Sequence, residues 1–214
     1  MPLSGCYKLG NVSVAVWKIT ENEAMLLAML PAEYSCTVLE MKSPGRRLEW
    51  LAVRALLAHV YGPDERIVYN SVGKPFLKNA DDCIGVSHTK GYAVLAYGNS
   101  GFGVDAELLS RNIMPLAGKI ACDGERNLLD SECANEALLM KWCACEALFK
   151  LVGDLGGTFR DNVLVELPSF SSSGSFPVSL VGVDSQCGRF FKADYIIIDG
   201  LLLVICEPRF SSES

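Results

Sequence analysis

The chain has 214 residues, half of them apolar, and a formal net charge of -6. This composition allows a sizeable buried core in one large domain or two small ones, and the acidic balance argues against a general nucleic-acid-binding protein. No apolar run approaches the roughly 20 residues that a membrane-spanning helix needs, and residues 1–6 lack the charged and apolar regions of a signal peptide. We therefore expect neither a nucleic-acid partner nor a membrane partner.

The nine cysteines are scattered and form no C-x-x-C pair. Small buried or half-buried thiols in a reducing compartment are the simpler interpretation, and a metal or redox role is the alternative. The cysteine usage therefore predicts a cytoplasmic protein.

Alternation of apolar residues predicts a strand at 11–17, and a helical stretch follows at about 21–30. Ser43 and Pro44 form a start signal for a second helix, whose apolar residues recur at helical spacing to residue 57. Residues 92–97 and 102–107 are predicted to form a hairpin around a Gly-Asn-Ser-Gly turn.

A helical pattern returns at 131–152, and the C-terminal part is rich in strand-forming residues. Asp199 and Gly200 separate two β-branched runs, which is a strong hairpin signal; the other expected strands are 162–167 and 178–183, with a loop at 169–175. The order of elements predicts a mixed α+β fold, and a break near Ser100 would give two α+β halves, 1–100 and 101–214.

Two pairs of charged residues indicate a possible metal site. Asp105 and Glu107 are two apart on a predicted strand, so their side chains leave the same face. Glu146 and Lys150 are four apart on a predicted helix and are therefore neighbours. If helix and strand cross, three carboxylates meet, and such oxygen ligands suit magnesium better than zinc. A solvated strand face and an ordinary surface ion pair are the alternatives.

A second set of residues suits the binding of phosphate oxygens. Lys74 lies in a Gly-Lys-Pro turn, and Ser87 and His88 end a short apolar run. Arg47, and with it Arg46, is offered by the earlier helix. For His88 alone, a structural hydrogen-bonded histidine remains the alternative.

Four segments, taken in order, resemble the signature of the 4′-phosphopantetheinyl transferases: Gly-Lys-Pro at 73–75, Gly-Val-Ser-His-Thr at 85–89, Gly-Val-Asp-Ala-Glu at 103–107 and Trp-Cys-Ala-Cys-Glu-Ala-Leu-Phe-Lys at 142–150. Each motif is weak alone, but the ordered set is specific. The length is similar to that of the single-chain type, in which two similar α/β halves form a pseudo-dimer with the active site between them. The resemblance therefore implies this fold and a monomer.

The resemblance also implies an activity, namely magnesium-dependent transfer of the 4′-phosphopantetheine group of coenzyme A to a serine of an apo acyl or peptidyl carrier protein. The implied metal ligands are Asp105, Glu107 and Glu146, and Glu146 is also the implied general base. The implied coenzyme A contacts are Lys150 and His88 on the phosphates, Lys74 and Ser87 on the nucleotide part, and Arg47 on the 3′-phosphate.

Cys145 departs from the family pattern, which has Lys-Glu-Ala where this chain has Cys-Glu-Ala. The missing cation predicts altered coenzyme A affinity, with Lys141 one helical turn earlier as a partial replacement, and a lysine restored at 145 is expected to tighten coenzyme A binding. Two alternatives stay open: a degenerate protein that binds coenzyme A or a carrier without transfer, and a magnesium-dependent phosphohydrolase. Residues 113–116 (Ile-Met-Pro-Leu) are a candidate carrier-docking segment, or an ordinary buried connector.

Overall fold

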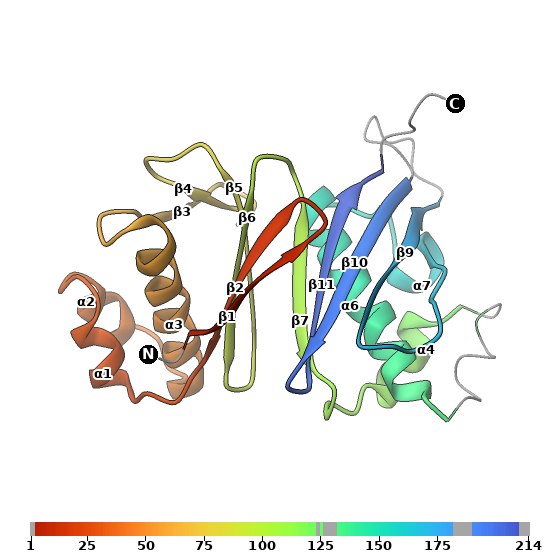
Figure 1. Ribbon diagram of the computed structural model, residues 1–214, viewed down its shortest axis with the longest axis horizontal. Coiled ribbons are helices and arrows are strands. Elements are labelled where there is room, and N and C mark those ends of the chain that lie inside the picture. Colours follow the sequence, from red (N-terminus) through yellow and green to blue (C-terminus); the bar gives the residue numbers. More distant parts are fainter. Residues whose placement is uncertain (1–2, 123–124, 126–131, 182–189, 210–214) are drawn as a thin grey trace. The chain divides into compact units, whose positions relative to one another are not determined.

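The computed structural model describes residues 3–122, 125, 132–181 and 190–209. The chain divides into two compact units, residues 1–100 and residues 101–214 (Figure 1). Each unit combines an antiparallel sheet with one long helix, so the mixed α+β class predicted from the sequence is confirmed. Within the described residues, no helix is both long and apolar enough to cross a membrane.

The first unit is built on a four-stranded antiparallel sheet in the order β1-β2-β6-β5. A separate two-stranded ribbon, β3-β4, comes after the three helices in the sequence and before the last two strands of this sheet. The strands are β1 (Leu3–Leu9), β2 (Val12–Lys18), β3 (Ile67–Tyr69), β4 (Pro75–Leu77), β5 (Cys83–Thr89) and β6 (Tyr92–Gly98), and the helices are α1 (Glu23–Ala28), α2 (Tyr34–Leu39) and α3 (Pro44–Tyr61).

The residues at the two ends of helix α3 explain where it begins and ends. The Ser43 side chain accepts a hydrogen bond from the Arg46 N–H, and Pro44 occupies the first turn, where no N–H is needed. Gly62 ends the helix with a φ of 91°, a conformation that glycine adopts without strain. The apolar face of α3 packs on β6 and β2, so one face of this sheet is buried.

The second unit is built on a five-stranded antiparallel sheet in the order β7-β11-β10-β9-β8. Helix α6 packs against β7 and β11 (Figure 1). The elements are β7 (Gly103–Leu108), the 3₁₀ helix η1 (Met114–Leu116), α4 (Ala117–Ile120), α6 (Ala134–Val152), α7 (Phe159–Asn162), β8 (Val163–Val165), β9 (Ser173–Leu180), β10 (Phe190–Ile198) and β11 (Leu201–Pro208).

The predicted hairpin around Asp199 and Gly200 is confirmed. Ile198 pairs with Leu201, and both turn residues have positive φ, 49° and 79°. This is the backbone twist that a two-residue connection between antiparallel strands requires.

The predicted hairpin between residues 92–97 and 102–107 is wrong. β6 lies between β2 and β5, so both of its hydrogen-bonding edges are occupied, and β7 pairs with β11. The glycine-rich segment that resembled a turn instead contains the point at which the two units divide. The hairpin that β6 does form is with β5, through a turn in which Gly91 has a φ of 79°.

Smaller differences concern element boundaries. The expected loop at 169–175 ends early, because β9 begins at Ser173 and pairs with β10. Strand β1 and helix α2 were not expected from the sequence. The start of the helix expected at 131 and the end of the strand expected at 182–183 lie outside the described residues.

Candidate active site

In the second unit, β7 presents its acidic residues to helix α6. A side chain at Gly103 would overlap the carbonyl group of Ala147, so the face of β7 that carries position 103 lies directly against α6. Because side chains alternate along a strand, Asp105 and Glu107 share that face. The structure thus brings together the strand and the helix whose crossing was the condition for a shared site.

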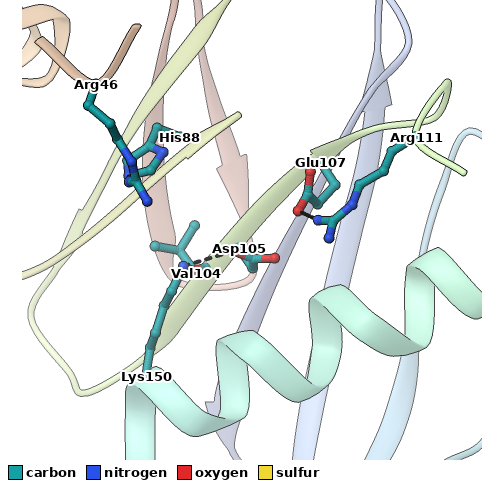
Figure 2. Close-up of polar contacts among 7 residues, drawn as sticks. All are labelled: Arg46, His88, Val104, Asp105, Glu107, Arg111 and Lys150. Carbon is teal, nitrogen blue, oxygen red and sulfur yellow. Dashed lines mark hydrogen bonds and ion pairs between the residues drawn. The ribbon is translucent and has the colours of Figure 1, made fainter. Parts of the chain in front are cut away.

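Lys150 of α6 is bonded to Asp105. Its ammonium group donates to Asp105 Oδ1 at 2.8 Å and to the carbonyl oxygen of Val104 at 2.9 Å (Figure 2). Only 10% of the Asp105 side chain is exposed, against 35% for Lys150. A nearly buried carboxylate therefore has a cation beside it that still reaches solvent.

Glu107 has a cation of its own, because Arg111 forms an ion pair with it (Figure 2). The Arg111 guanidinium also lies over the ring of Trp142, 5.4 Å from the ring centre, within the range of a cation–π interaction. Arg111 therefore links the strand face to α6.

Glu146 belongs to the same electrostatic environment. Burial raises the pKa of its carboxyl group, and the negative charge of Asp105 adds to the rise, while Lys150 and Arg111 oppose it. Two carboxylates that repel in this way favour a cation nearby.

Cys143 is fully buried one helical turn before Glu146 and Ala147, and its thiol is hydrogen-bonded to Asp105. Burial raises the pKa of Cys143 well above its usual value, and the Asp105 charge raises it further. The thiol therefore stays protonated and donates to the carboxylate, which helps to fix the Asp105 side chain.

The donor chemistry of this cluster fits magnesium. All three acidic side chains offer oxygen ligands, and burial together with the nearby Asp105 charge raises the pKa of Glu146. Over the described ranges, however, no three Asp, Glu, His or Cys side chains converge closely enough to hold an ion as the side chains stand. Instead, Asp105 forms an ion pair with Lys150, and Glu107 forms one with Arg111.

Cys145 lies in the core of the second unit and not at its surface. Its side chain is fully buried, and burial raises the pKa of its thiol to about 12. Lys141, one turn earlier, is also fully buried and forms an ion pair with Glu125, which also accepts a hydrogen bond from the backbone N–H of Cys122. Lys141, which the sequence analysis named as a partial replacement for the cation missing at 145, is thus paired with a nearly buried glutamate.

In the first unit, His88 of β5 contacts two residues of α3. Arg46 Nη1 lies 2.8 Å from His88 Nε2 (Figure 2), and Glu49 Oε2 lies 3.2 Å from His88 Nδ1. The sequence analysis singled out His88 and named Arg46 only beside Arg47. Glu49 was not singled out, although it is three residues after Arg46 and so on the same helical face.

The remaining expected residues occupy different settings. Arg47 is turned to Glu23, at 2.7 Å, and to the carbonyl oxygen of Met41, at 3.1 Å. Lys74 is half-buried in a turn whose backbone is held by the Asn70 side chain, and Ser87 is buried on β5. His88 therefore contacts Arg46, whereas Arg47 is paired with Glu23 and Met41.

Two further residues of the second-unit site were missed by sequence reasoning. Arg111 follows β7 by a few residues, and only the fold returns it to Glu107. Cys143 looked like one of many scattered thiols, and only its burial beneath Asp105 distinguishes it. Glu107 and Arg111 are four residues apart, a spacing that indicates neighbouring side chains only in a helix, and Glu107 was predicted to lie on a strand.

No family model matches the chain. Among curated proteins, it is 27% identical over 167 residues, 76% of each chain, to the 4'-phosphopantetheinyl transferase AcpT of Escherichia coli O157:H7, and it matches the AcpT of strain K12 equally well. With the ordered motifs already described, these alignments support membership of the 4′-phosphopantetheinyl transferase superfamily.

Proposed function

We propose that this protein transfers the 4′-phosphopantetheine group of coenzyme A to a serine hydroxyl of an apo acyl or peptidyl carrier protein. The observation that carries the proposal is the cluster of Asp105, Glu146 and Lys150, in which a buried carboxylate, a carboxyl of raised pKa and an accessible cation lie together. Membership of the superfamily supplies the reaction class.

In this reaction, the serine oxygen bonds to the phosphorus that carries the pantetheine arm, and the bond from that phosphorus to adenosine 3′,5′-bisphosphate breaks. The serine proton passes to Glu146, directly or through water. A carboxylate whose pKa is raised by burial is a stronger base than a solvated one, which suits it to this role.

Magnesium would be held by Asp105, Glu107 and Glu146, where it would offset the charge of the coenzyme A pyrophosphate. In the structure, two of these carboxylates are paired with Lys150 and Arg111. Lys150 would contact the phosphates, which is the role in coenzyme A binding that the family motif implies for it.

We assign the nucleotide part of coenzyme A to the first unit. His88 contacts the phosphates, Lys74 and Ser87 bind the nucleotide, and Arg47 or its neighbour Arg46 binds the 3′-phosphate. In this proposal the protein is a cytoplasmic monomer whose two units form a pseudo-dimer, as in the single-chain members of the superfamily.

The direct test is intact-mass analysis of apo carrier proteins incubated with the protein, coenzyme A and magnesium chloride. We expect a mass gain of one phosphopantetheine arm that EDTA abolishes. Asp105→Asn should abolish the gain, whereas Asp194→Asn should retain it, because Asp194 is an equally buried carboxylate of the same unit that pairs with Lys192.

Two other outcomes would contradict the proposal in different ways. Coenzyme A binding without transfer to any of several carriers would indicate the degenerate binding protein. Release of phosphate from nucleotides without a carrier would indicate the phosphohydrolase.

A further inference from the structure

Two residues of helix α3, one helical turn apart, contact the two ring nitrogens of His88. Arg46 Nη1 is 2.8 Å from Nε2, and Glu49 Oε2 is 3.2 Å from Nδ1. The side chains of Glu49 and His88 are 18% and 35% exposed, so the pair is partly shielded from water. A histidine held on both sides is more narrowly oriented than a surface residue of this exposure needs to be.

These contacts define the protonation of the ring. A guanidinium group only donates hydrogen bonds, so Nε2 accepts from Arg46 and carries no proton. The proton is then on Nδ1, which donates it to the Glu49 carboxylate. Glu49 therefore selects one tautomer of a neutral imidazole and fixes the plane of the ring.

The arrangement changes when an anion arrives. Arg46 is exposed and forms stronger, bidentate bonds with a phosphate than with an imidazole nitrogen. Once Arg46 turns to the phosphate, Nε2 can bond to the same anion only after it takes up a proton. The negative charge of Glu49 favours the protonated ring, because an adjacent opposite charge stabilises a cation.

Strands β6 and β4 also pack against β5, the strand that carries His88. Its cross-strand partner on β6 is Ala93, and the three residues of β4 are Pro75, Phe76 and Leu77. The charged groups that contact the two ring nitrogens are Arg46 and Glu49, both from α3.

We propose that Glu49 is a positioning residue for phosphate binding: it holds His88 with Nε2 toward the anion and supports its protonation there. This role rests on the proposed function, which assigns His88 to the phosphates of coenzyme A. Glu49 itself does not touch the ligand, since a carboxylate and a phosphate repel each other.

The test is a double-mutant cycle on coenzyme A affinity, measured by isothermal titration calorimetry. Glu49→Gln keeps an acceptor for Nδ1 without the charge, and Glu49→Leu removes both. We expect Glu49→Gln to weaken binding several-fold and Glu49→Leu about tenfold in the unsubstituted background, but neither to weaken it further when His88→Ala is present.

Proton uptake gives a second readout that a purely structural role would not change. Titrations in buffers of different ionisation enthalpy should show that binding takes up a proton near pH 7.5, and that Glu49→Gln reduces this uptake. The matched control is Glu33→Gln, because Glu33 pairs with Arg66 in the same unit at 2.6 Å and lies outside the proposed site. It should leave affinity and proton uptake unchanged.

Additive effects of the Glu49 and His88 substitutions, or an unchanged proton uptake in Glu49→Gln, would overturn the positioning role alone. Failure of the unsubstituted protein to bind coenzyme A would overturn the proposed function, and this role with it. Thermal melting of every variant separates a loss of fold from a loss of binding.

Discussion

Gly103 on β7 lies so close to Ala147 on α6 that a Cβ atom at 103 would overlap the Ala147 carbonyl oxygen and lie 2.7 Å from its carbonyl carbon. The absence of a side chain at this one position lets the helix approach the strand. The same approach allows Lys150, three residues after Ala147, to reach Asp105, two residues after Gly103.

Gly103→Ala should therefore damage both the fold and the site. The methyl group meets backbone atoms that cannot move without shifting the helix, so we expect a loss of about 1–3 kcal/mol in the free energy of unfolding. Transfer activity should fall as well, because α6 carries Glu146 and Lys150. Gly101→Ala is the matched control, since its Cβ would meet only the Leu151 side chain at 3.7 Å. Equal stability of the two variants in urea unfolding would contradict this account.

The buried Lys141–Glu125 ion pair should be sensitive to the loss of either partner. Lys141→Met leaves a nearly buried carboxylate without its cation and should cost about 3–5 kcal/mol of stability. Cys145→Lys should also destabilise the protein and should not tighten coenzyme A binding, because residue 145 is in the core beside Lys141. This revises the expectation drawn from the sequence.

The double variant Lys141→Met with Cys145→Lys should recover part of that stability, since an ammonium one turn along the helix can serve the same glutamate. The test is the free energy of unfolding in urea of the unsubstituted protein, the two single variants and the double variant. A double variant no more stable than Lys141→Met would show that position 145 cannot reach Glu125.

Arg46 and Arg47 should differ in their effects on coenzyme A binding. The Arg46 side chain contacts the imidazole of His88, whereas Arg47 is held by Glu23 and by Met41. We expect Arg46→Ala to weaken coenzyme A binding about tenfold, as for loss of a charge-assisted contact. Arg47→Ala should change stability by less than about 1 kcal/mol, because its ion pair is partly exposed. A larger affinity loss in Arg47→Ala would instead make Arg47 the 3′-phosphate ligand.

Met114 should contribute to carrier docking. In the candidate segment, Ile113 is fully buried and Leu116 packs on the core, whereas Met114 is 37% exposed at the start of η1. Met114→Glu should raise the Michaelis constant for an acidic carrier protein about tenfold through repulsion and lost apolar contact, with little change for coenzyme A. Equal changes for both substrates in steady-state kinetics would rule out the docking role.

The thiols of α6 and β11 should be inert while the protein is folded. Burial raises the pKa of Cys145 to about 12, so at pH 8 about one thiol in 10,000 is ionised. Burial also raises the pKa of Cys143 and Cys206, and the same protection applies to them. Peptide mapping after iodoacetamide treatment should find Cys6, Cys36, Cys83 and Cys133 alkylated, since these are exposed. Rapid alkylation of Cys145 without denaturant would contradict its burial.

Local chemistry allowed several elements to be predicted from the sequence. Ser43 and Pro44 mark the start of α3, and Asp199 and Gly200 mark the β10–β11 turn, because caps and tight turns depend on a few adjacent residues. The pairing partner of β7 could not be predicted in this way. A glycine-rich turn next to it suggested β6, while the actual partner, β11, begins almost a hundred residues later.

The sequence by itself determined the residue types of the site and their periodicity: two carboxylates on one face of a strand, and a glutamate and a lysine on one face of a helix. Those periods follow from backbone geometry alone. Only the tertiary structure decided which charges meet, since Arg111 joins Glu107, Lys150 joins Asp105, and Glu49 and Arg46 share His88. It also decided that Cys145 is a core residue, because burial depends on contacts between segments distant in the sequence, such as α6 and β11.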